Sequence, residues 1–339
     1  MFDHKNECHP PLSSTKASEP ISTTSGEIKV TFELSPLRVG GKSPAGVLNI
    51  AHRGARAFAP ENTLVAFEKA KAFGCPMFEI DVHMAKDGEL VVHHDDQLTR
   101  CTNAQARFPG RSTYYISDFS YDELCLLDAG RWYVEQLLLP ASQRQTFLQD
   151  LTDEELDQFV SAQDRKFYVS GEIKLPTLKQ TLELAQRSDM MVNIELKTLP
   201  RMYPELADAV VTLVESLGME LRVLISSFDH EQLVRVRRRT NIIATGALTS
   251  DRLSNVGEYL QLLDADAYNP GCNGDYDSIG FNSVSGTLDP CGIVNARAFG
   301  RGVNVWTCNN KVEMRRLIAA GVTGLISDFP NRVREVLGE

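Results

Sequence analysis

Residues 77–82 read Met-Phe-Glu-Ile-Asp-Val, a short apolar run that is interrupted at alternate positions by Glu79 and Asp81. Residues 191–196 read Met-Val-Asn-Ile-Glu-Leu and repeat this pattern, with Glu195 on the polar side. Successive side chains of a β-strand point to opposite faces of the sheet. Each run therefore predicts a strand with one apolar face and one polar face.

Similar runs recur from residue 47 onward and alternate with amphipathic stretches, which is typical of a parallel α/β fold. Eight strands are predicted, at Val47–His52, Met77–Val82, Met191–Leu196, Arg222–Ser226, Ile242–Ala247, Ala265–Asn269, Val303–Thr307 and Gly324–Ser327. The clearest helices between them are Thr63–Phe73, Pro204–Leu217, His230–Arg239, Asp251–Leu263 and Lys311–Ala320. We therefore predict an α/β fold of the (β/α)8 type, a TIM barrel, which typically takes about 250 residues.

Two segments depart from this repeat. The run Glu89–His94 follows the second strand too closely for a crossover helix, which needs at least about 10–12 residues, and Asp87-Gly88 is a hairpin turn signal. We expect this run to be an excursion above the carboxyl end of the second strand. Residues 99–173 are too long for a simple connection and predict an inserted subdomain on the same face, with a helical segment at Thr152–Val160.

The ends of the barrel follow from composition. Residues 1–46 are rich in Ser, Thr, Pro, Lys and Gly and are expected to form a partly disordered N-terminal extension. A short apolar alternation around Val30–Leu37 is expected to be an edge strand or a cover for the barrel bottom. The barrel is expected to span residues 47–339, with Asn62 as the N-cap of its first helix and Gly74 as the stop.

The chain of 339 residues has a formal net charge of −10, which disfavours nucleic acid as a partner. An acidic protein that acts on an anion needs local positive charge, and a bound cation would supply it. The seven cysteines include no Cys-x-x-Cys pair, which argues against a zinc site or a disulfide framework. With no secretory signal and no transmembrane segment expected, we predict a cytoplasmic protein. The sequence does not indicate an oligomeric state.

Three acidic side chains point to a metal site. The carboxyl ends of barrel strands carry the active groups, and Glu79, Asp81 and Glu195 lie at such ends on the faces that should point inward. Carboxylates that converge in one lumen repel each other and are costly to desolvate, a cost that a divalent cation removes. Ligation by oxygen favours Mg2+, Ca2+ or Mn2+ over zinc. A lone Glu-x-Asp pair could simply face water, but two such strand ends in succession weaken that interpretation.

His52, at the end of the first strand, and His94 are expected at the same barrel mouth, where imidazoles suit general acid–base catalysis. Arg53 and Lys197 would supply cationic donors for an anionic substrate. Trp306 is expected either to wall the substrate pocket or to pack in the core. The other histidines are expected outside the catalytic set: His93 points away, His83 lies at the rim, and His230, His4 and His9 lie on the surface.

An ordered series of motifs resembles the glycerophosphodiester phosphodiesterase family. The series contains Ala51-His-Arg-Gly54, Ala59-Pro-Glu-Asn-Thr63, Glu79-Ile-Asp81, Lys86-Asp-Gly-Glu-Leu-Val-Val92, His94-Asp95 and Leu98-Thr-Arg100. It continues through Asn193-Ile-Glu-Leu-Lys197, Ile225-Ser-Ser-Phe228, Val305-Trp-Thr307 and Gly321-Val-Thr-Gly-Leu-Ile-Ser-Asp-Phe-Pro330. The likeness runs from about residue 47 to the C-terminus.

This resemblance implies a TIM barrel that cleaves glycerophosphodiesters to glycerol 3-phosphate and an alcohol. It implies that Glu79, Asp81 and Glu195 bind the metal and that His52 and His94 act as acid and base. It places Arg53 and Lys197 near the phosphate. It also gives Glu61 a place in the substrate-binding site, which this residue would shape through a hydrogen bond near His52 or Arg53.

Several alternatives stay open. The nucleophile is either the glycerol 2-hydroxyl of the substrate or water. A lysophospholipase D, which keeps the acyl chain of its substrate, is an alternative enzyme, and a non-catalytic barrel that binds phosphodiesters is an alternative of another class. The insertion 99–173 and the segment from Tyr268 to Ser285 frame the leaving-group side and depart from the family pattern, so the alcohol is not predicted.

Overall fold

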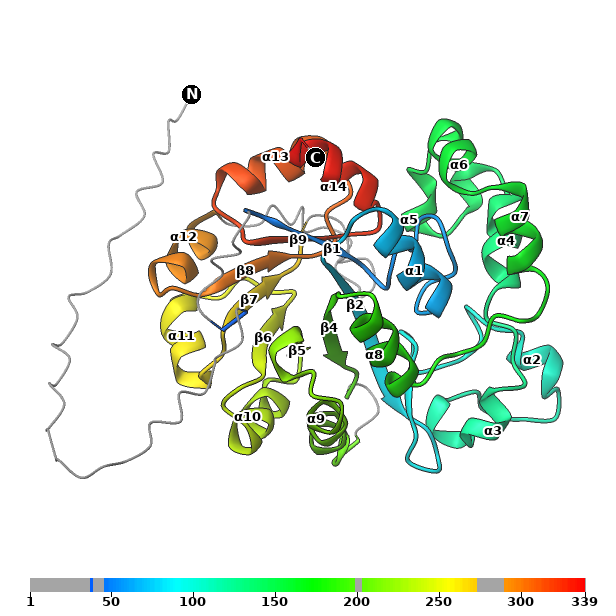
Figure 1. Cartoon of the computed structure of the whole chain (residues 1–339), viewed down its shortest axis with the longest axis horizontal. Coiled ribbons are helices and arrows are strands. Elements are labelled where there is room, and N and C mark those ends of the chain that lie inside the picture. Colours follow the sequence, from blue (N-terminus) through cyan, green and yellow to red (C-terminus); the bar gives the residue numbers. More distant parts are fainter. Residues whose placement is uncertain (1–36, 39–45, 199–202, 273–289, 339) are drawn as a thin grey trace, which may run out of the picture.

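The computed structural model describes residues 37–38, 46–198, 203–272 and 290–338. Within this part of the chain, the strands are β1 Leu48–Ala51, β2 Met77–Met84, β3 Leu90–Val92, β4 Met191–Leu196, β5 Val223–Ser227, β6 Ala244–Thr249, β7 Ala267–Pro270, β8 Gly302–Val305 and β9 Gly324–Ser327. They pair in the order β1-β9-β8-β7-β6-β5-β4-β2-β3, and β1 also pairs with β2, so the sheet closes (Figure 1). All except β3 are parallel to their neighbours, which confirms the predicted TIM barrel.

Helices surround the closed sheet (Figure 1). They are α1 Leu64–Ala72, α8 Leu178–Arg187, α9 Leu206–Ser216, α10 His230–Arg239, α11 Val256–Leu263, α12 Pro290–Ala298, α13 Lys311–Ala319 and α14 Pro330–Leu337, with a short 3-10 turn, η3, at Glu220–Arg222. Their apolar faces cover the outward side chains of the strands, such as Phe78, Ile80 and Val82 of β2, which are fully buried. The alternation in residues 77–82 therefore gives β2 an apolar face that points outward, as predicted.

The start of α1 corrects one local prediction. The N-cap is Thr63, whose side-chain oxygen accepts a hydrogen bond from the backbone of Ala66 (3.4 Å), and not Asn62. Asn62 lies in the left-handed region with φ 54°, and its side-chain amide donates to Asp81 (2.8 Å). The amide is thus used by the site and not by the helix. Gly74, with φ 76°, follows the helix as expected.

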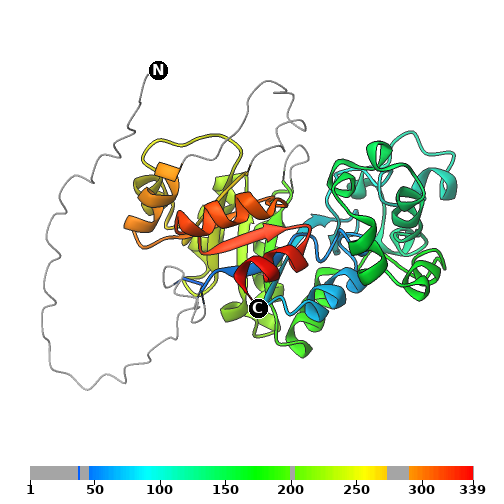
Figure 2. The ribbon, with the colours of Figure 1, turned by 90° about the horizontal axis from the view of Figure 1, so that it is seen from above.

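The excursion after β2 is a hairpin, as predicted. β2 continues to Met84 because its last residues pair antiparallel with β3, with Val82 opposite Val92. The chain between β3 and α8 then forms short helices, α2 Ala104–Arg107, η1 Ile116–Asp118, α3 Tyr121–Leu124, α4 Arg131–Leu137, η2 Ala141–Gln143, α5 Thr146–Gln149, α6 Asp153–Phe159 and α7 Ala162–Tyr168. These helices gather on one side of the barrel in both views (Figures 1 and 2).

Leu37 and Arg38 are the described residues that precede the barrel. Leu37 packs against the apolar side chains at the bottom of the lumen, and Arg38 Nε donates to Asp266 (3.0 Å). Most of the alternation expected around Val30–Leu37 lies outside the described residues. None of the described helices has the length and apolar character that a bilayer crossing requires.

Candidate active site

The lumen of the barrel changes from apolar to charged along its axis. Its lower part is filled by inward-facing apolar side chains, Ile50, Met77, Leu224, Ala244, Ala267 and Ile326. The next layer is polar: Ser226 donates to Asn193 (2.8 Å), and Asn304 donates to Asn269 (3.1 Å). The charged groups follow at the carboxyl ends of the strands, where parallel barrels carry their active sites.

Three carboxylates that were predicted from separate strands meet at this end. One oxygen from each of Glu79, Asp81 and Glu195 lies within 4.8 Å of the others. The strand register explains this, because Asp81 on β2 lies opposite Glu195 on β4, and Glu79 lies one inward position below Asp81. The three inward positions expected from the strand alternation thus converge in the structure.

Burial and mutual repulsion act on these acids. Burial, together with the negative charges of Asp81 and Glu195, raises the pKa of Glu79 well above its ordinary value, and burial also raises the pKa of Glu195. Asp81 differs: burial opposes its ionisation, but the neighbouring His94, Lys197 and Arg53 together lower its pKa. The buried Oε1 of Glu79 has no hydrogen-bond partner. A divalent cation would satisfy this oxygen and offset the repulsion, so the donor set fits the predicted oxygen-ligated metal.

Arg53 is held against these acids by its backbone and its side chain. Its φ of 53° turns its N–H toward Glu79 Oε2 (2.9 Å), and its guanidinium donates to Glu61 Oε1 (2.9 Å) and lies 3.5 Å from Asp81. Gly54 then packs so closely on α1 that a Cβ there would lie 2.7 Å from the backbone of Ala66. The His-Arg-Gly sequence therefore fits a turn pressed between β1 and α1.

Lys197 is the second cation of the site. Its Nζ lies 2.8 Å from Glu195 Oε1 and 3.6 Å from Asp81 Oδ1. Burial opposes its charge, but the two carboxylates raise the pKa of Lys197 above its ordinary value. Lys197 and Arg53 thus both pair with the acids of the predicted metal site.

His52 lies beside the acids and is oriented by Asp328. Its Nδ1 lies 2.7 Å from Asp328 Oδ1, and its Nε2 lies 3.8 Å from Glu79 Oε2. Asp328 also accepts from Arg56 Nη2 (3.1 Å) and Asn309 Nδ2 (2.7 Å). Burial, with the positive charge of Arg56, lowers the pKa of His52, whereas Arg56 and His52 outweigh burial and lower the pKa of Asp328. An ionised Asp328 places the imidazole proton on Nδ1 and leaves Nε2 free to accept.

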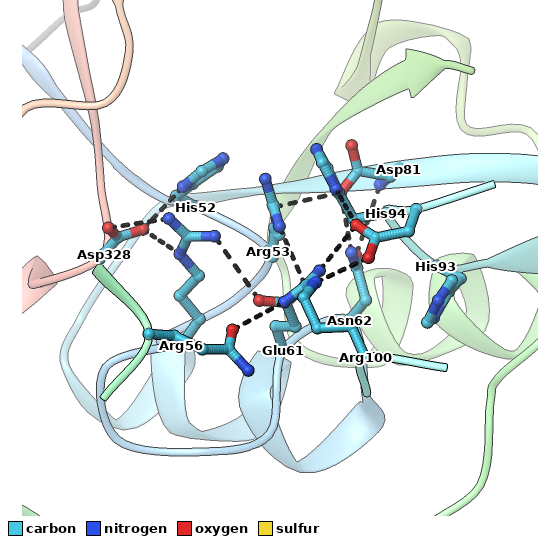
Figure 3. Close-up of polar contacts among 12 residues, drawn as sticks. His52, Arg53, Arg56, Glu61, Asn62, Asp81, His93, His94, Arg100 and Asp328 are labelled. Carbon is cyan, nitrogen blue, oxygen red and sulfur yellow. Dashed lines mark hydrogen bonds and ion pairs between the residues drawn. The ribbon is translucent and has the colours of Figure 1, made fainter. Parts of the chain in front are cut away.

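His94 has a matching arrangement. Its Nδ1 lies 2.7 Å from Asp95 Oδ1, and Asp95 accepts two hydrogen bonds from Arg100, at 2.7 Å and 2.9 Å. Burial, with the charges of Arg53 and Lys197, lowers the pKa of His94 well below its ordinary value. Figure 3 shows Arg53 between the two imidazoles. The structure thus brings His52 and His94 to one mouth, His52 beside Glu79 and His94 beside Asp81.

Several residues of this arrangement were not assigned to the site from the sequence. They are Asn62, Arg56, Arg100, Asp328 and Asn309. Asp328 carried a usable signal, because it directly follows β9 at the carboxyl end of the barrel and stands in one of the family-like motifs. Arg100 also stands in such a motif, whereas Arg56 carried no signal, because its partner Asp328 is 272 positions away.

Trp306 lies immediately beyond β8, so the predicted strand Val303–Thr307 ends earlier than expected. Its indole donates to the carbonyl of Asn269 (2.8 Å), and its ring packs edge-to-face on Phe228 (5.4 Å between centroids). It also contacts the inward apolar cluster of the lumen. Trp306 therefore combines core packing with a place near the mouth, and Phe228 beside it is partly exposed.

The other histidines include two corrections. His93 points away from the pair, as predicted, with Nε2 3.3 Å from the carbonyl of Gln97. His83 was expected at the rim but is buried, because Tyr203 packs on its ring and its Nε2 bonds the carbonyl of His94 (3.1 Å). His230 was expected on the surface but is half-buried, since both ring nitrogens have partners, the hydroxyl of Tyr259 and a carbonyl of β6. His4, His9 and the segment 273–285 lie outside the described residues.

Comparison with known proteins agrees with this geometry. The model of the Glycerophosphoryl diester phosphodiesterase family matches residues 52–332. A glycerophosphodiester phosphodiesterase of Bacillus altitudinis is 30% identical over 291 residues, which cover 85% of this chain and 97% of the relative. One from Caldanaerobacter subterraneus is 29% identical over 283 residues, covering 84% and 94%. The chain therefore belongs to the glycerophosphoryl diester phosphodiesterase family, as its motifs suggested.

Solved structures support the fold. A structure from Silicibacter pomeroyi aligns with a TM-score of 0.69 over 90% of this chain and 97% of its own, at 25% identity. A phosphodiesterase of Oleispira antarctica, solved in complex with the product sn-glycerol-3-phosphate, aligns with a TM-score of 0.65 over 88% and 99%, also at 25% identity. The barrel and the enzyme class, a phosphoric diester hydrolase, thus agree between sequence, structure and relatives.

Proposed function

We propose that this protein hydrolyses glycerophosphodiesters to glycerol 3-phosphate and an alcohol, with the help of one divalent cation. The observation that carries the proposal is the convergence of Glu79, Asp81 and Glu195 next to two imidazoles, those of His52 and His94. The product bound to the Oleispira antarctica phosphodiesterase is the product expected here.

The scattered cysteines favour a cytoplasmic location.

Glu79, Asp81 and Glu195 would hold the cation, with Mg2+, Ca2+ and Mn2+ all suited to their oxygens. When bound, such an ion offsets the charge of the phosphodiester and the charge that develops in the transition state. Arg53 and Lys197 would donate to the phosphate oxygens from the same side, which requires them to share their hydrogen bonds with the carboxylates.

The two histidines would carry the protons. Because Nδ1 of each ring is taken by a carboxylate, Nε2 is the nitrogen available for transfer. One imidazole would take the proton of the nucleophile, and the other would give a proton to the leaving alcohol oxygen. The bound phosphodiester anion would raise the pKa of the imidazole that acts as acid. The nucleophile is either the glycerol 2-hydroxyl, which gives a cyclic phosphate that water opens, or water itself.

The helices between residues 99 and 173 are proposed to act as an inserted subdomain that frames the leaving-group side. They contribute side chains to the site: Gln145 accepts from Arg100 (3.0 Å), and the ring of Phe147 lies 4.2 Å from the guanidinium carbon of Arg56. Through these contacts the insertion touches Arg100 and Arg56, the arginines that pair with the aspartate partners of His94 and His52. It is therefore placed to influence which alcohol is accepted.

The experiment that tests the function is a hydrolysis panel. Glycerophosphocholine, glycerophosphoethanolamine, glycerophosphoinositol and lysophosphatidylcholine would each be incubated with the protein before chelation, after chelation, and after return of Mg2+, Ca2+ or Mn2+. We expect glycerol 3-phosphate from at least one glycerophosphodiester, loss of turnover on chelation, and recovery with a divalent ion. Release of choline from lysophosphatidylcholine alone would favour a lysophospholipase D. Hydrolysis of none of the four would favour a phosphodiester-binding barrel.

A further inference from the structure

A chain of ion pairs connects the two histidines through Glu61 (Figure 3). On one side, Arg56 Nη1 lies 3.5 Å from Glu61 Oε2, and Arg56 pairs with Asp328, the partner of His52. On the other side, Arg100 Nη2 lies 2.5 Å from Glu61 Oε1, and Arg100 pairs with Asp95, the partner of His94. One carboxylate thus lies between two arginines, each of which holds the aspartate of one catalytic histidine.

Glu61 is buried among cationic side chains and is not a free surface carboxylate. Its side chain is 2% exposed, and three guanidiniums surround it, those of Arg53 (2.9 Å), Arg56 and Arg100. Removing its charge would leave three buried or half-buried cations without the carboxylate that separates them, and buried like charges repel strongly. Its oxygens face guanidiniums, so its effect on substrate would pass through those groups.

The orientation of the arginines depends on this carboxylate. Arg100 uses two nitrogens on Asp95 and shares Nη2 with Glu61, so the plane of its guanidinium is fixed by both acids. Arg56 binds Asp328 through Nε and Nη2, and its Nη1 forms an ion pair without a hydrogen bond with Glu61 Oε2, at 3.5 Å. Because a guanidinium is a rigid planar fork, moving one end moves the other.

We infer that Glu61 is a positioning residue shared by both histidines: through Arg56 and Arg100 it fixes the two aspartates that orient His52 and His94. This inference rests on the proposed function and extends the expectation that Glu61 shapes the substrate-binding site through a hydrogen bond near Arg53. It predicts that a single substitution at Glu61 disturbs two imidazoles that make no hydrogen bond to it. A residue that only supports the fold would not have this paired effect.

The first test is Glu61→Gln, which keeps the shape and removes the charge. We expect kcat to fall about 10–100-fold, because small misplacements of catalytic groups cost that much, while KM changes by no more than about threefold, since no substrate contact is lost. Nitrogen–proton NMR of the imidazoles should show altered signals for His52 and His94. His230, whose two nitrogens bond elsewhere, serves as the unmoved internal reference.

The matched control is Asp266→Asn. Asp266 is also a buried carboxylate between two arginines, Arg38 (3.0 Å) and Arg237 (2.7 Å), but it precedes β7 at the opposite end of the barrel. Its substitution should lower stability and leave both kcat and the signals of His52 and His94 unchanged. This control separates the effect of removing any buried carboxylate charge from the effect of disturbing the positions of His52 and His94.

Two further variants separate the arms of the network and serve if Glu61→Gln fails to fold. Arg100→Lys keeps the charge but not the fork, so it should shift the imidazole signals of His94 and leave those of His52 in place. Arg56→Lys should do the reverse. Since Glu61 acts on His94 through Arg100, Glu61→Gln combined with Arg100→Lys should lose at least about threefold less kcat than the product of the single effects.

The outcomes distinguish this inference from the proposed function. If His52→Ala and His94→Ala abolish turnover while Glu61→Gln keeps kcat and both imidazole signals, the positioning role is overturned and the function stands. A shift of one imidazole in Glu61→Gln, or multiplicative effects in the double variant, also overturns it. If the two alanine variants remain active, the proposed function itself fails.

Discussion

Each catalytic histidine candidate is paired with an aspartate, His52 with the buried Asp328 and His94 with the half-buried Asp95. A carboxylate partner alone would raise an imidazole pKa, yet the pKa values of both His52 and His94 are lowered, because burial and nearby cations outweigh the partners. Neutral imidazoles can accept a proton near neutral pH. The aspartates Asp328 and Asp95 therefore serve mainly to choose the nitrogen that stays protonated and to fix the ring.

The residue-scale prediction concerns His52→Ala and His94→Ala. Each should lower kcat by about 10²–10⁴-fold in the hydrolysis of a glycerophosphodiester, because a general acid or base contributes about that much. His230→Ala is the control, since His230 bonds the hydroxyl of Tyr259 and a backbone carbonyl outside the acid–histidine cluster. Turnover near the wild-type value in either of the first two variants would contradict that residue's assignment.

The sequence was sufficient to predict those site residues whose position follows from the alternation of side chains along a strand. Alternation placed Glu79, Asp81 and Glu195 inward, and the carboxyl-end rule placed His52 beside them. It missed that Asp328 orients His52, because the two are 276 positions apart and meet only when β1 pairs with β9. It misplaced His83, because parity along β2 does not reveal that Tyr203, 120 positions further along the chain, packs on its ring.

At the scale of elements, the hairpin of β2 and β3 delivers His94 to the mouth. β3 pairs with the last residues of β2, and His83 of β2 bonds the carbonyl of His94 just beyond β3. His93, the neighbour with opposite parity, is turned toward Gln97 instead. The short spacing that ruled out a crossover helix was therefore enough to predict how the second histidine arrives.

The helices of the insertion are tied to the barrel by polar contacts. The hydroxyl of Tyr133 in α4 donates to the carbonyl of Ala57 (2.6 Å), and Glu155 in α6 accepts from Asn331 (2.9 Å) and Arg332 in α14. The length of the segment indicated an excursion, but these anchors could not be predicted, since they join residues up to 177 positions apart.

The element-scale prediction concerns Glu155→Gln and acid. Burial opposes ionisation of Glu155, but Arg332 and Asn331 lower its pKa from 4.5 to about 2. A carboxyl with a lowered folded pKa stabilises the fold above pH 4.5, and this contribution is lost as the pH falls toward 2. We expect the variant to lose about 1 kcal/mol of unfolding free energy at pH 7, less than the full pKa difference would give because solvent screens the group.

Denaturant titrations of wild type and Glu155→Gln at several pH values would measure this effect. The gap in unfolding free energy should be constant between pH 7 and pH 5 and should shrink between pH 4.5 and pH 2. A gap that is the same at all pH values would show that the ion pair between α6 and α14 does not stabilise the fold through the charge of Glu155.

At the scale of the whole molecule, the apolar core of the lumen and the charged site lie at different levels along the barrel axis. Apolar side chains fill the bottom, amides and hydroxyls form a layer above them, and the charges follow at the carboxyl ends. The period of strands and helices was sufficient to predict this closed barrel. Strand ends such as those of β7 and β8 shifted by one or two residues, because pairing with neighbours sets them.

The central claim is that three acids from β2 and β4 bind one cation between the two histidines. Isothermal titration calorimetry with Mg2+, Ca2+ and Mn2+ tests it most directly, on wild type and on Glu79→Gln and Glu195→Gln. We predict one ion per wild-type chain for at least one metal, and an affinity at least about tenfold weaker in both variants. Failure of all three ions to bind the wild type, or equal affinity in Glu195→Gln, would contradict the claim.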